Sequence, residues 1–113
     1  MRFHHLAILV SDLPRAEAFY VGLLGLPVVM RWEDRSIWIG LEGEAFLAVE
    51  RVDVVSPGPC VALAIEKEAR EPWRARLLSA GVSIEKESDF TIYFRDPDGN
   101  LLEVSNYAEA PAA

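Results

Sequence analysis

Three side chains of the types that hold metal ions or move protons stand out in this chain: His5, Cys60 and Glu103. An imidazole offers a neutral nitrogen, a thiolate a sulfur and a carboxylate an oxygen, and these are the donors that divalent transition metals take from proteins. Each residue also has a simpler interpretation, which the sequence leaves open. The histidine is then a hydrogen-bonded, partly buried side chain, the cysteine a small buried hydrophobe, and the glutamate a carboxylate at the rim of a sheet.

Two further features of the sequence are not expected to bind a metal ion. His4 directly precedes His5, and successive side chains of a strand point to opposite faces, so we expect His4 on the other face as a structural or surface residue. The run from Asp96 to Gly99 has too few ligands for a calcium loop and predicts a turn before the last strand.

The elements that must position these residues begin with a strand at 6–10 and a helix. The capping side chains Ser11 and Asp12 mark the start of the helix, and Pro14 is compatible with its first turn. Gly25 is predicted to end the helix. Runs rich in β-formers predict the strands that follow, at Val28–Trp32, Ser36–Leu41 and Ala45–Arg51. This is one β-α-β-β-β unit.

The same order returns after a Pro- and Gly-rich linker at 53–59. We predict a strand at 60–66, a helix at 72–80 stopped by Gly81, and strands at 83–86, Thr91–Arg95 and 101–107. The chain thus divides into a first repeat at 1–52 and a second at 60–107, both within a single domain.

A shift of 55 positions lays the two repeats on each other. It brings His5 onto Cys60, Trp38 onto Tyr93 and Ala48 onto Glu103. Trp38 and Tyr93 therefore occupy equivalent strands, where both are predicted to line a cavity and stack on a planar ligand, or else to serve ordinary sheet packing.

Strand alternation assigns faces to these residues. His5, Ala7 and Leu9 share one face of the first strand, and the apolar residues between them are expected to meet the helix. In the last strand, Glu103 and Tyr107 fall on one face, so a carboxylate sits mid-strand on the face that a cavity would use.

Composition limits the classes of function. The 113 residues fit one compact domain, and the formal charge of −7 argues against nucleic acid or an anionic membrane as a partner. No apolar run approaches the roughly 20 residues needed to cross a bilayer, so we expect a cytoplasmic protein. Cys60 is the only cysteine, which excludes an internal disulfide.

The motifs at the two ends of the chain resemble those of the vicinal oxygen chelate superfamily, which includes glyoxalase I, extradiol dioxygenases and bleomycin-resistance proteins. The resemblance runs from about His5 to Val104. It is carried by His5-x-Ala7-Ile8-x-Val10-x-Asp12-Leu13, Phe19-Tyr20, Leu24-Gly25-Leu26 and Phe94-x-Asp96-Pro97-Asp98-Gly99-Asn100-x-x-Glu103.

The resemblance implies an α+β fold in which two tandem β-α-β-β-β repeats form a cupped, open-barrel mixed sheet. It also implies four metal-site positions, which fall on His5, Ala48, Cys60 and Glu103. Only His5 and Glu103 are ordinary ligands of the superfamily. Cys60 stands where histidine is usual, and the alanine side chain at position 48 cannot bind a metal. Glu50, two residues on, would replace Ala48 if the strand register shifted.

Two functions follow as expectations. The first is a metal-dependent lyase, isomerase or dioxygenase acting on a small oxygen-bearing substrate, with His5, Glu103 and Cys60 holding Zn, Ni, Mn or Fe and Glu50 as a speculative catalytic proton acceptor. The alternative is a protein without metal that sequesters a cationic planar drug or metabolite, as the bleomycin-resistance branch does. Homodimers are expected in either case, because members of the superfamily of this size commonly pair.

Overall fold

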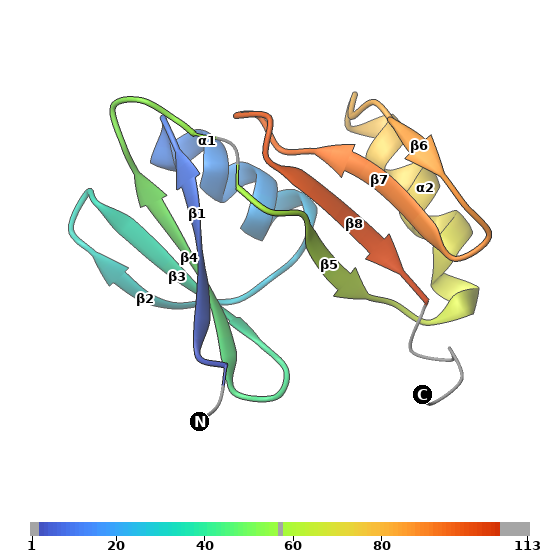
Figure 1. The fold of residues 1–113 in the computed structure, drawn as a ribbon, viewed down its shortest axis with the longest axis horizontal. Helices are drawn as coiled ribbons and strands as arrows, with labels where there is room; N and C mark the ends of the chain where they lie inside the picture. The colour runs from blue at the N-terminus through green and yellow to red at the C-terminus, as the bar shows by residue number, and fades with distance from the viewer. Residues whose placement is uncertain (1–2, 57, 107–113) are drawn as a thin grey trace. The chain divides into compact units, whose positions relative to one another are not determined.

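Each half of the chain forms a four-stranded mixed sheet with one helical segment (Figure 1). The structure is a computed structural model that describes residues 3–56 and 58–106. It divides into two units, Met1–Gly58 and Pro59–Ala113. The prediction of an α+β fold built from two β-α-β-β-β units is confirmed.

The first unit has the strand order β1-β4-β3-β2, with β1 parallel to β4 and the other pairs antiparallel. Its elements are β1 (His5–Val10), α1 (Leu13–Glu17), η1 (Ala18–Leu23), β2 (Val28–Trp32), β3 (Ser36–Leu41) and β4 (Ala45–Arg51).

The first helix begins where the sequence predicts but changes its winding half-way. The Asp12 side chain caps α1 by accepting the Arg15 backbone N–H at 2.9 Å. From Ala18 the helix continues as η1, a π-helix in which the Leu24 N–H donates to the Phe19 carbonyl, five residues back. Gly25, with φ at +74°, then ends it as expected.

The second unit repeats this topology with the order β5-β8-β7-β6, β5 and β8 being parallel. Its elements are β5 (Val61–Ala64), η2 (Lys67–Ala69), α2 (Arg70–Ser79), β6 (Lys86–Glu87), β7 (Thr91–Arg95) and β8 (Leu101–Ser105). The α2 helix lies behind the strands of its own unit in Figure 1.

Strand pairing in the two units is equivalent once the residue numbers are shifted by the 55 positions found in the sequence. Trp38 is opposite Ala48 in the first sheet, and Tyr93 is opposite Glu103 in the second. Ala7 likewise pairs with Ala48, as Ala62 pairs with Glu103. The two sheets therefore place residues separated by 55 positions at equivalent points.

Four elements of the second unit differ in their bounds from the sequence-based expectation. The strand predicted at 101–107 ends at Ser105. The strand predicted at 60–66 covers only Val61–Ala64, because β8 offers it four paired residues. The strand predicted at 83–86 shrinks to Lys86–Glu87, and the helix predicted at 72–80 starts earlier, since Pro72 occupies its first turn. Tyr107 lies outside the described residues.

Burial alternates along β1 as predicted, since Ile8 and Val10 are buried while His5 and Ala7 are exposed. The inner strand β4 departs from this alternation, because Leu47, Ala48 and Val49 are all buried. The buried apolar residues of the first unit are Ile8, Val10, Leu13, Ala16, Phe19, Tyr20, Leu24, Ile37, Ile39, Leu47, Ala48 and Val49. Their counterparts in the second unit are Val61, Leu77, Ile92, Phe94, Leu102 and Val104. None of the helices in the described ranges has the length and hydropathy of a membrane span.

Candidate functional site

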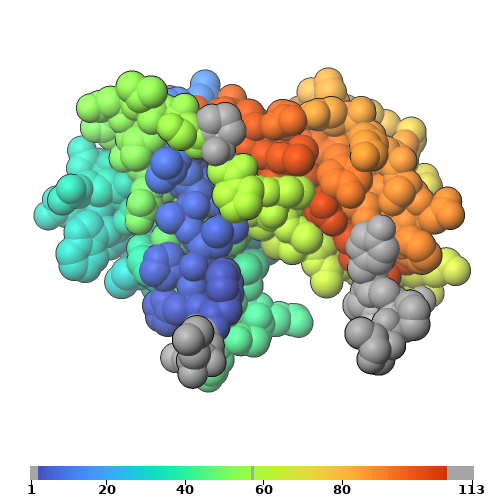
Figure 2. Space-filling view, in the orientation of Figure 1, coloured from blue at the N-terminus to red at the C-terminus, as the bar shows by residue number. Residues whose placement is uncertain are grey.

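The first sheet carries His5 on the face that points away from its helix. His5 is exposed, and β1 lies open on the surface turned to the viewer in Figure 2, where it is drawn in blue. The His5 ring lies beside the indole of Trp38, with ring centroids 4.6 Å apart. The structure thus brings together two residues that the sequence predicted for the site.

His4 belongs to the same group, so its predicted placement on the opposite face is wrong. The His4 and His5 rings meet edge to face at 5.2 Å, and their Nδ1 atoms are 2.9 Å apart. Alternation fails here because β1 begins at His5, which leaves the His4 side chain outside the strand. Phe46, which no sequence motif singled out, lies 5.5 Å from the His4 ring. We call His4, His5, Trp38 and Phe46 the imidazole–aromatic cluster.

The remaining predicted positions of the first unit lie along β4. Ala48 is fully buried between its partners on β1 and β3. Glu50 is half-buried and pairs with Leu9 and Ser36. Pairing runs through β4 without a shift in either ladder, so Glu50 stays two residues beyond Ala48 rather than replacing it.

In the second unit, Cys60 and Glu103 are in direct contact. The Cys60 Sγ donates a hydrogen bond to Glu103 Oε2 at 3.3 Å. Glu103 sits half-buried in the middle of β8, an inner strand, and is therefore not a carboxylate at the rim of the sheet. Cys60 directly precedes β5 and is exposed, which contradicts the interpretation of Cys60 as a buried hydrophobe. We call these two residues the thiol–carboxylate pair.

The surroundings of the pair hold the thiol in its neutral form. Partial loss of hydration, followed by the hydrogen bond and the negative charge of Glu103, raises the pKa of the Cys60 thiol to about 11. The positive charge of Arg95 opposes this rise in pKa without cancelling it. Cys60 is consequently a poor nucleophile at neutral pH unless a cation displaces its proton.

Tyr93 occupies the position in the second sheet that Trp38 has in the first. It is half-buried opposite Glu103, and its ring carries the Lys86 Nζ 5.3 Å from the centroid. Two residues along β7, Arg95 is held by Glu85 through contacts of 2.7 and 3.0 Å. Tyr93 thus lies next to the thiol–carboxylate pair with a positive charge over its ring.

Residues 3–56 and 58–106 contain no group of three His, Cys, Asp or Glu side chains that could hold a metal ion. The ligand set predicted from the sequence takes His5 from the first unit and Cys60 and Glu103 from the second. It stays a prediction.

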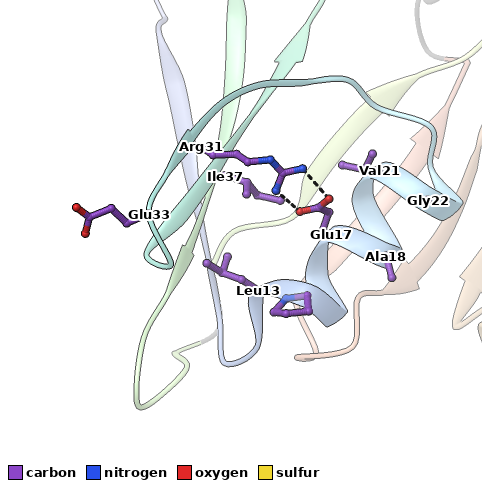
Figure 3. Close-up of a pocket in the computed structure, with 9 residues that line it drawn as sticks. Leu13, Glu17, Ala18, Val21, Gly22, Arg31, Glu33 and Ile37 are labelled. Atoms are coloured by element: carbon purple, nitrogen blue, oxygen red, sulfur yellow. Dashed lines mark hydrogen bonds and ion pairs between the residues drawn. The ribbon is translucent and has the colours of Figure 1, made fainter.

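A pocket that the sequence did not indicate lies on the helix side of the first unit. Its volume is about 570 Å³, and its walls come from the first helix, β2 and β3. Arg31 bridges it by donating from both Nη atoms to the two carboxylate oxygens of Glu17, with Nη2 to Oε2 at 2.8 Å, while Glu33 points away (Figure 3). None of the predicted site residues lines this pocket.

Comparison with known families tests the resemblance. A family model described as the glyoxalase/bleomycin resistance protein/dioxygenase superfamily matches residues 2–104. The chain belongs to this superfamily. The match covers both units and both clusters, so the prediction made from the terminal motifs is confirmed.

Relatives within the glyoxalase superfamily include two transferases. A glutathione transferase FosA of Serratia marcescens is 32% identical over 113 residues, covering 89% of this chain and 77% of that protein. A metallothiol transferase FosB of Shouchella clausii is 31% identical over 113 residues, with the same 89% and 77% coverage.

Several solved structures share the fold of this chain. A lactoylglutathione lyase from Agrobacterium tumefaciens has a TM-score of 0.78 at 22% identity, covering 92% of both chains. A fosfomycin resistance protein FosX from Listeria monocytogenes has a TM-score of 0.79 at 19% identity, covering 93% of this chain and 92% of that one. An integron cassette protein from a sewage outfall metagenome has a TM-score of 0.81 at 22% identity, covering 92% of this chain and 97% of that one.

Proposed function

We propose that this protein is a divalent-metal-dependent enzyme acting on a small oxygen-bearing substrate, with Cys60 and Glu103 of the second unit holding the ion. The observation that carries the proposal is the 3.3 Å contact between Cys60 Sγ and Glu103 Oε2. Two potential donors converge there, one from the residue before β5 and one from β8, at positions that the superfamily resemblance assigns to metal ligands.

The spacing of the two donors fits a single ion. A tetrahedral zinc ion, with its usual bond lengths to sulfur and oxygen, holds those atoms about 3.6 Å apart. The observed 3.3 Å therefore needs only a small adjustment to accommodate an ion. A sulfur and an oxygen donor together favour zinc, while nickel or iron would suit this mixed pair better than manganese.

The chemistry supplied by a bound ion would be Lewis-acid stabilisation of negative charge on the substrate oxygens. The residues of the chain then have distinct tasks. Each sheet presents one aromatic side chain for stacking on a planar group, Trp38 in the first sheet and Tyr93 in the second. Glu50, on the same strand face as Ala48, is proposed as the proton acceptor.

The names of two relatives suggest which reaction to assay first. The two transferases, at 31% and 32% identity, point to transfer of a thiol to a small electrophilic compound. The lyase, isomerase and dioxygenase reactions known in the superfamily are the further candidates. We propose thiol transfer as the first assay, with fosfomycin as the acceptor and glutathione as the thiol.

Metal content decides the metal-dependent proposal. Protein purified without a polyhistidine tag is expected to hold about one divalent ion per chain. Glu103→Ala should lose the ion, whereas Glu42→Ala, in the exposed turn between β3 and β4, should retain it. Apoprotein that binds no zinc, nickel, manganese or iron at micromolar concentration would remove the proposal.

A second candidate function is sequestration of a cationic planar compound without a metal. The imidazole–aromatic cluster favours it, because a group of neighbouring aromatic rings and a net charge of −7 attract such ligands. A thermal-shift screen with cationic planar compounds and glycopeptides checks this candidate. Melting temperatures that stay unchanged across the panel, and that are equal in Trp38→Ala, would exclude it.

We also propose that the protein is a homodimer, as the superfamily resemblance implies. Sedimentation velocity should then give twice the chain mass of 12.6 kDa. A species at 12.6 kDa throughout the micromolar range would contradict the dimer without affecting the metal proposal.

A further inference from the structure

The pocket on the helix side of the first unit combines apolar walls with a single ion pair. Its volume of about 570 Å³ is within the range that holds a small organic molecule. The lining residues all belong to the first unit, so the pocket is complete without the thiol–carboxylate pair. Most of the lining residues are apolar, namely Leu13, Pro14, Ala18, Val21 and Ile37.

The π-helical segment η1 supplies one wall of this pocket. Ala18 and Gly22 lie about one turn apart on it, and both are small. A Cβ added at Gly22 would have no heavy atom within 4 Å, so the space beside the helix is open at that point. Short π-helical turns occur frequently at functional sites. The unusual winding thus coincides with a wall that leaves room for a ligand.

The ion pair of Glu17 and Arg31 crosses the pocket (Figure 3). Both Nη atoms of Arg31 donate to the carboxylate, with Nη2 to Oε2 at 2.8 Å. The Arg31 side chain is 55% exposed and that of Glu17 34%. An ion pair this open to water is weak, so another cation can replace one partner at little cost. Arg31 is the partner that can withdraw into water, because it is the more exposed of the two.

The charges around the pocket favour a cationic ligand. Two carboxylates, Glu17 and Glu33, and the one guanidinium of Arg31 line it, and the whole chain carries a net charge of −7. An anion bound to Arg31 would be repelled by the neighbouring Glu17 carboxylate, whereas a cation that replaces the guanidinium meets an opposite charge. A planar guanidinium or amidinium also reproduces the two parallel hydrogen bonds, which a primary ammonium does not.

We infer that this pocket binds a small organic cation whose apolar body carries a guanidinium or amidinium group, and that this group pairs with Glu17 in place of Arg31. Arg31 is then a competitor that belongs to the chain itself. The inference does not depend on the proposed metal site. It also differs from sequestration at the imidazole–aromatic cluster, because Ile37 and Trp38 are adjacent in β3 and point to opposite faces of the sheet.

Benzamidine is the first probe, because it joins an amidinium to an apolar ring. Benzamide, which is neutral, and benzoate, which is anionic, are matched ligands of nearly the same shape. NMR titration of the backbone amides is expected to show saturable binding of benzamidine, with both control ligands weaker by about tenfold or more. Equal affinity for all three ligands, or no saturable binding of benzamidine at millimolar concentration, would overturn the inference.

The same titration locates the bound ligand. Amide shifts are expected at Val21 and Gly22, in the wall formed by η1. Shifts at His5 and Phe46, without shifts in η1, would assign the binding to the imidazole–aromatic cluster and would also overturn the inference.

Two substitutions in the ion pair should change the affinity for benzamidine in opposite directions. Glu17→Gln removes the carboxylate and should weaken binding about tenfold or more. Arg31→Gln removes the competitor and should strengthen binding about two- to fivefold, since an exposed ion pair opposes the ligand only weakly. Trp38→Ala, on the other face of the sheet, should leave the affinity unchanged, and the amide spectra establish that each variant folds. Weaker binding in Arg31→Gln, or unchanged binding in Glu17→Gln, would contradict the exchange of partners at Glu17.

Discussion

At the scale of single residues, the reactivity of Cys60 depends on its contact with Glu103. Partial desolvation and the neighbouring carboxylate raise the pKa of this thiol to about 11, so its thiolate fraction at pH 7 is about one part in ten thousand. We therefore predict that alkylation of the metal-free protein by iodoacetamide is slow at neutral pH and rises as the pH passes through about 11. Mass spectrometry of the labelled protein at a series of pH values measures this profile.

The matched variant for this prediction is Glu103→Gln. It removes the negative charge that opposes the thiolate, so the midpoint of the alkylation profile should move to lower pH. Cys60→Ser should take up no label, which confirms that the signal comes from the single cysteine. A wild-type midpoint at the ordinary thiol value would show that the contact with Glu103 does not form.

Glu17 gives a second residue-scale prediction. The hydrogen bonds from Arg31, and then its positive charge, lower the pKa of this carboxyl. Because the folded-state pKa lies below the unfolded value, the stabilising effect is present at neutral pH and is lost as the pH falls through the folded-state pKa. Arg31→Gln should return the Glu17 pKa toward the ordinary value, as followed by NMR titration of the carboxyl carbon.

Glu33 provides the control, since it lines the same pocket but points away from the ion pair (Figure 3). Glu33→Gln should leave the Glu17 titration unchanged. High salt should reduce the difference between wild type and Arg31→Gln, because both partners are open to solvent. A Glu17 pKa that is the same in wild type and Arg31→Gln would contradict the pairing.

At the scale of elements, the loop before β8 determines the position of Glu103 in that strand. The buried Asp96 accepts the backbone N–H groups of Asp98 and Asn100 at 2.9 and 2.8 Å, and the Asn100 side-chain amide at 2.9 Å. Its oxygens thus bind the chain itself, which supports the prediction of a turn rather than a calcium loop. Register in β8 follows from this turn.

We predict that Asp96→Ala lowers the free energy of unfolding by about 2–4 kcal/mol, because buried donors lose their acceptor. Urea denaturation followed by circular dichroism measures the change. Asp96→Asn retains one carbonyl oxygen for the two backbone donors and should cost clearly less. Equal stability in the alanine variant and the wild type would show that the turn forms without these bonds.

Elements and faces could be predicted because they depend on local chemistry. The Asp12 cap, the left-handed Gly25 and the alternation along β1 each act within a few residues. The π-helical winding of η1 could not be predicted, since its apolar spacing fits an α-helix as well. The short β6 likewise depends on pairing with β7, which is not encoded in its own residues.

The candidate site was predictable only in part, for the same reason. The motifs predict His5, Cys60 and Glu103 as site residues, and the repeat predicts Trp38 and Tyr93. The contact of His4 with His5 was missed because it depends on the residue at which β1 begins. The ion pair of Glu17 and Arg31 was missed because only the packing of β2 brings residues 14 positions apart together.

At the scale of the whole molecule, the metal proposal predicts that each chain binds one ion through the thiol–carboxylate pair. Cobalt(II) is a suitable probe, because a thiolate ligand adds a charge-transfer band to its spectrum and the visible bands report the other donors. We predict that the cobalt-loaded protein shows the thiolate band, and that Cys60→Ser abolishes it. Glu103→Ala should change the visible bands of the same ion and weaken its binding, whereas Glu42→Ala should leave both unchanged. Cobalt spectra and affinity that are identical in wild type and Glu103→Ala would show that the carboxylate does not bind the ion.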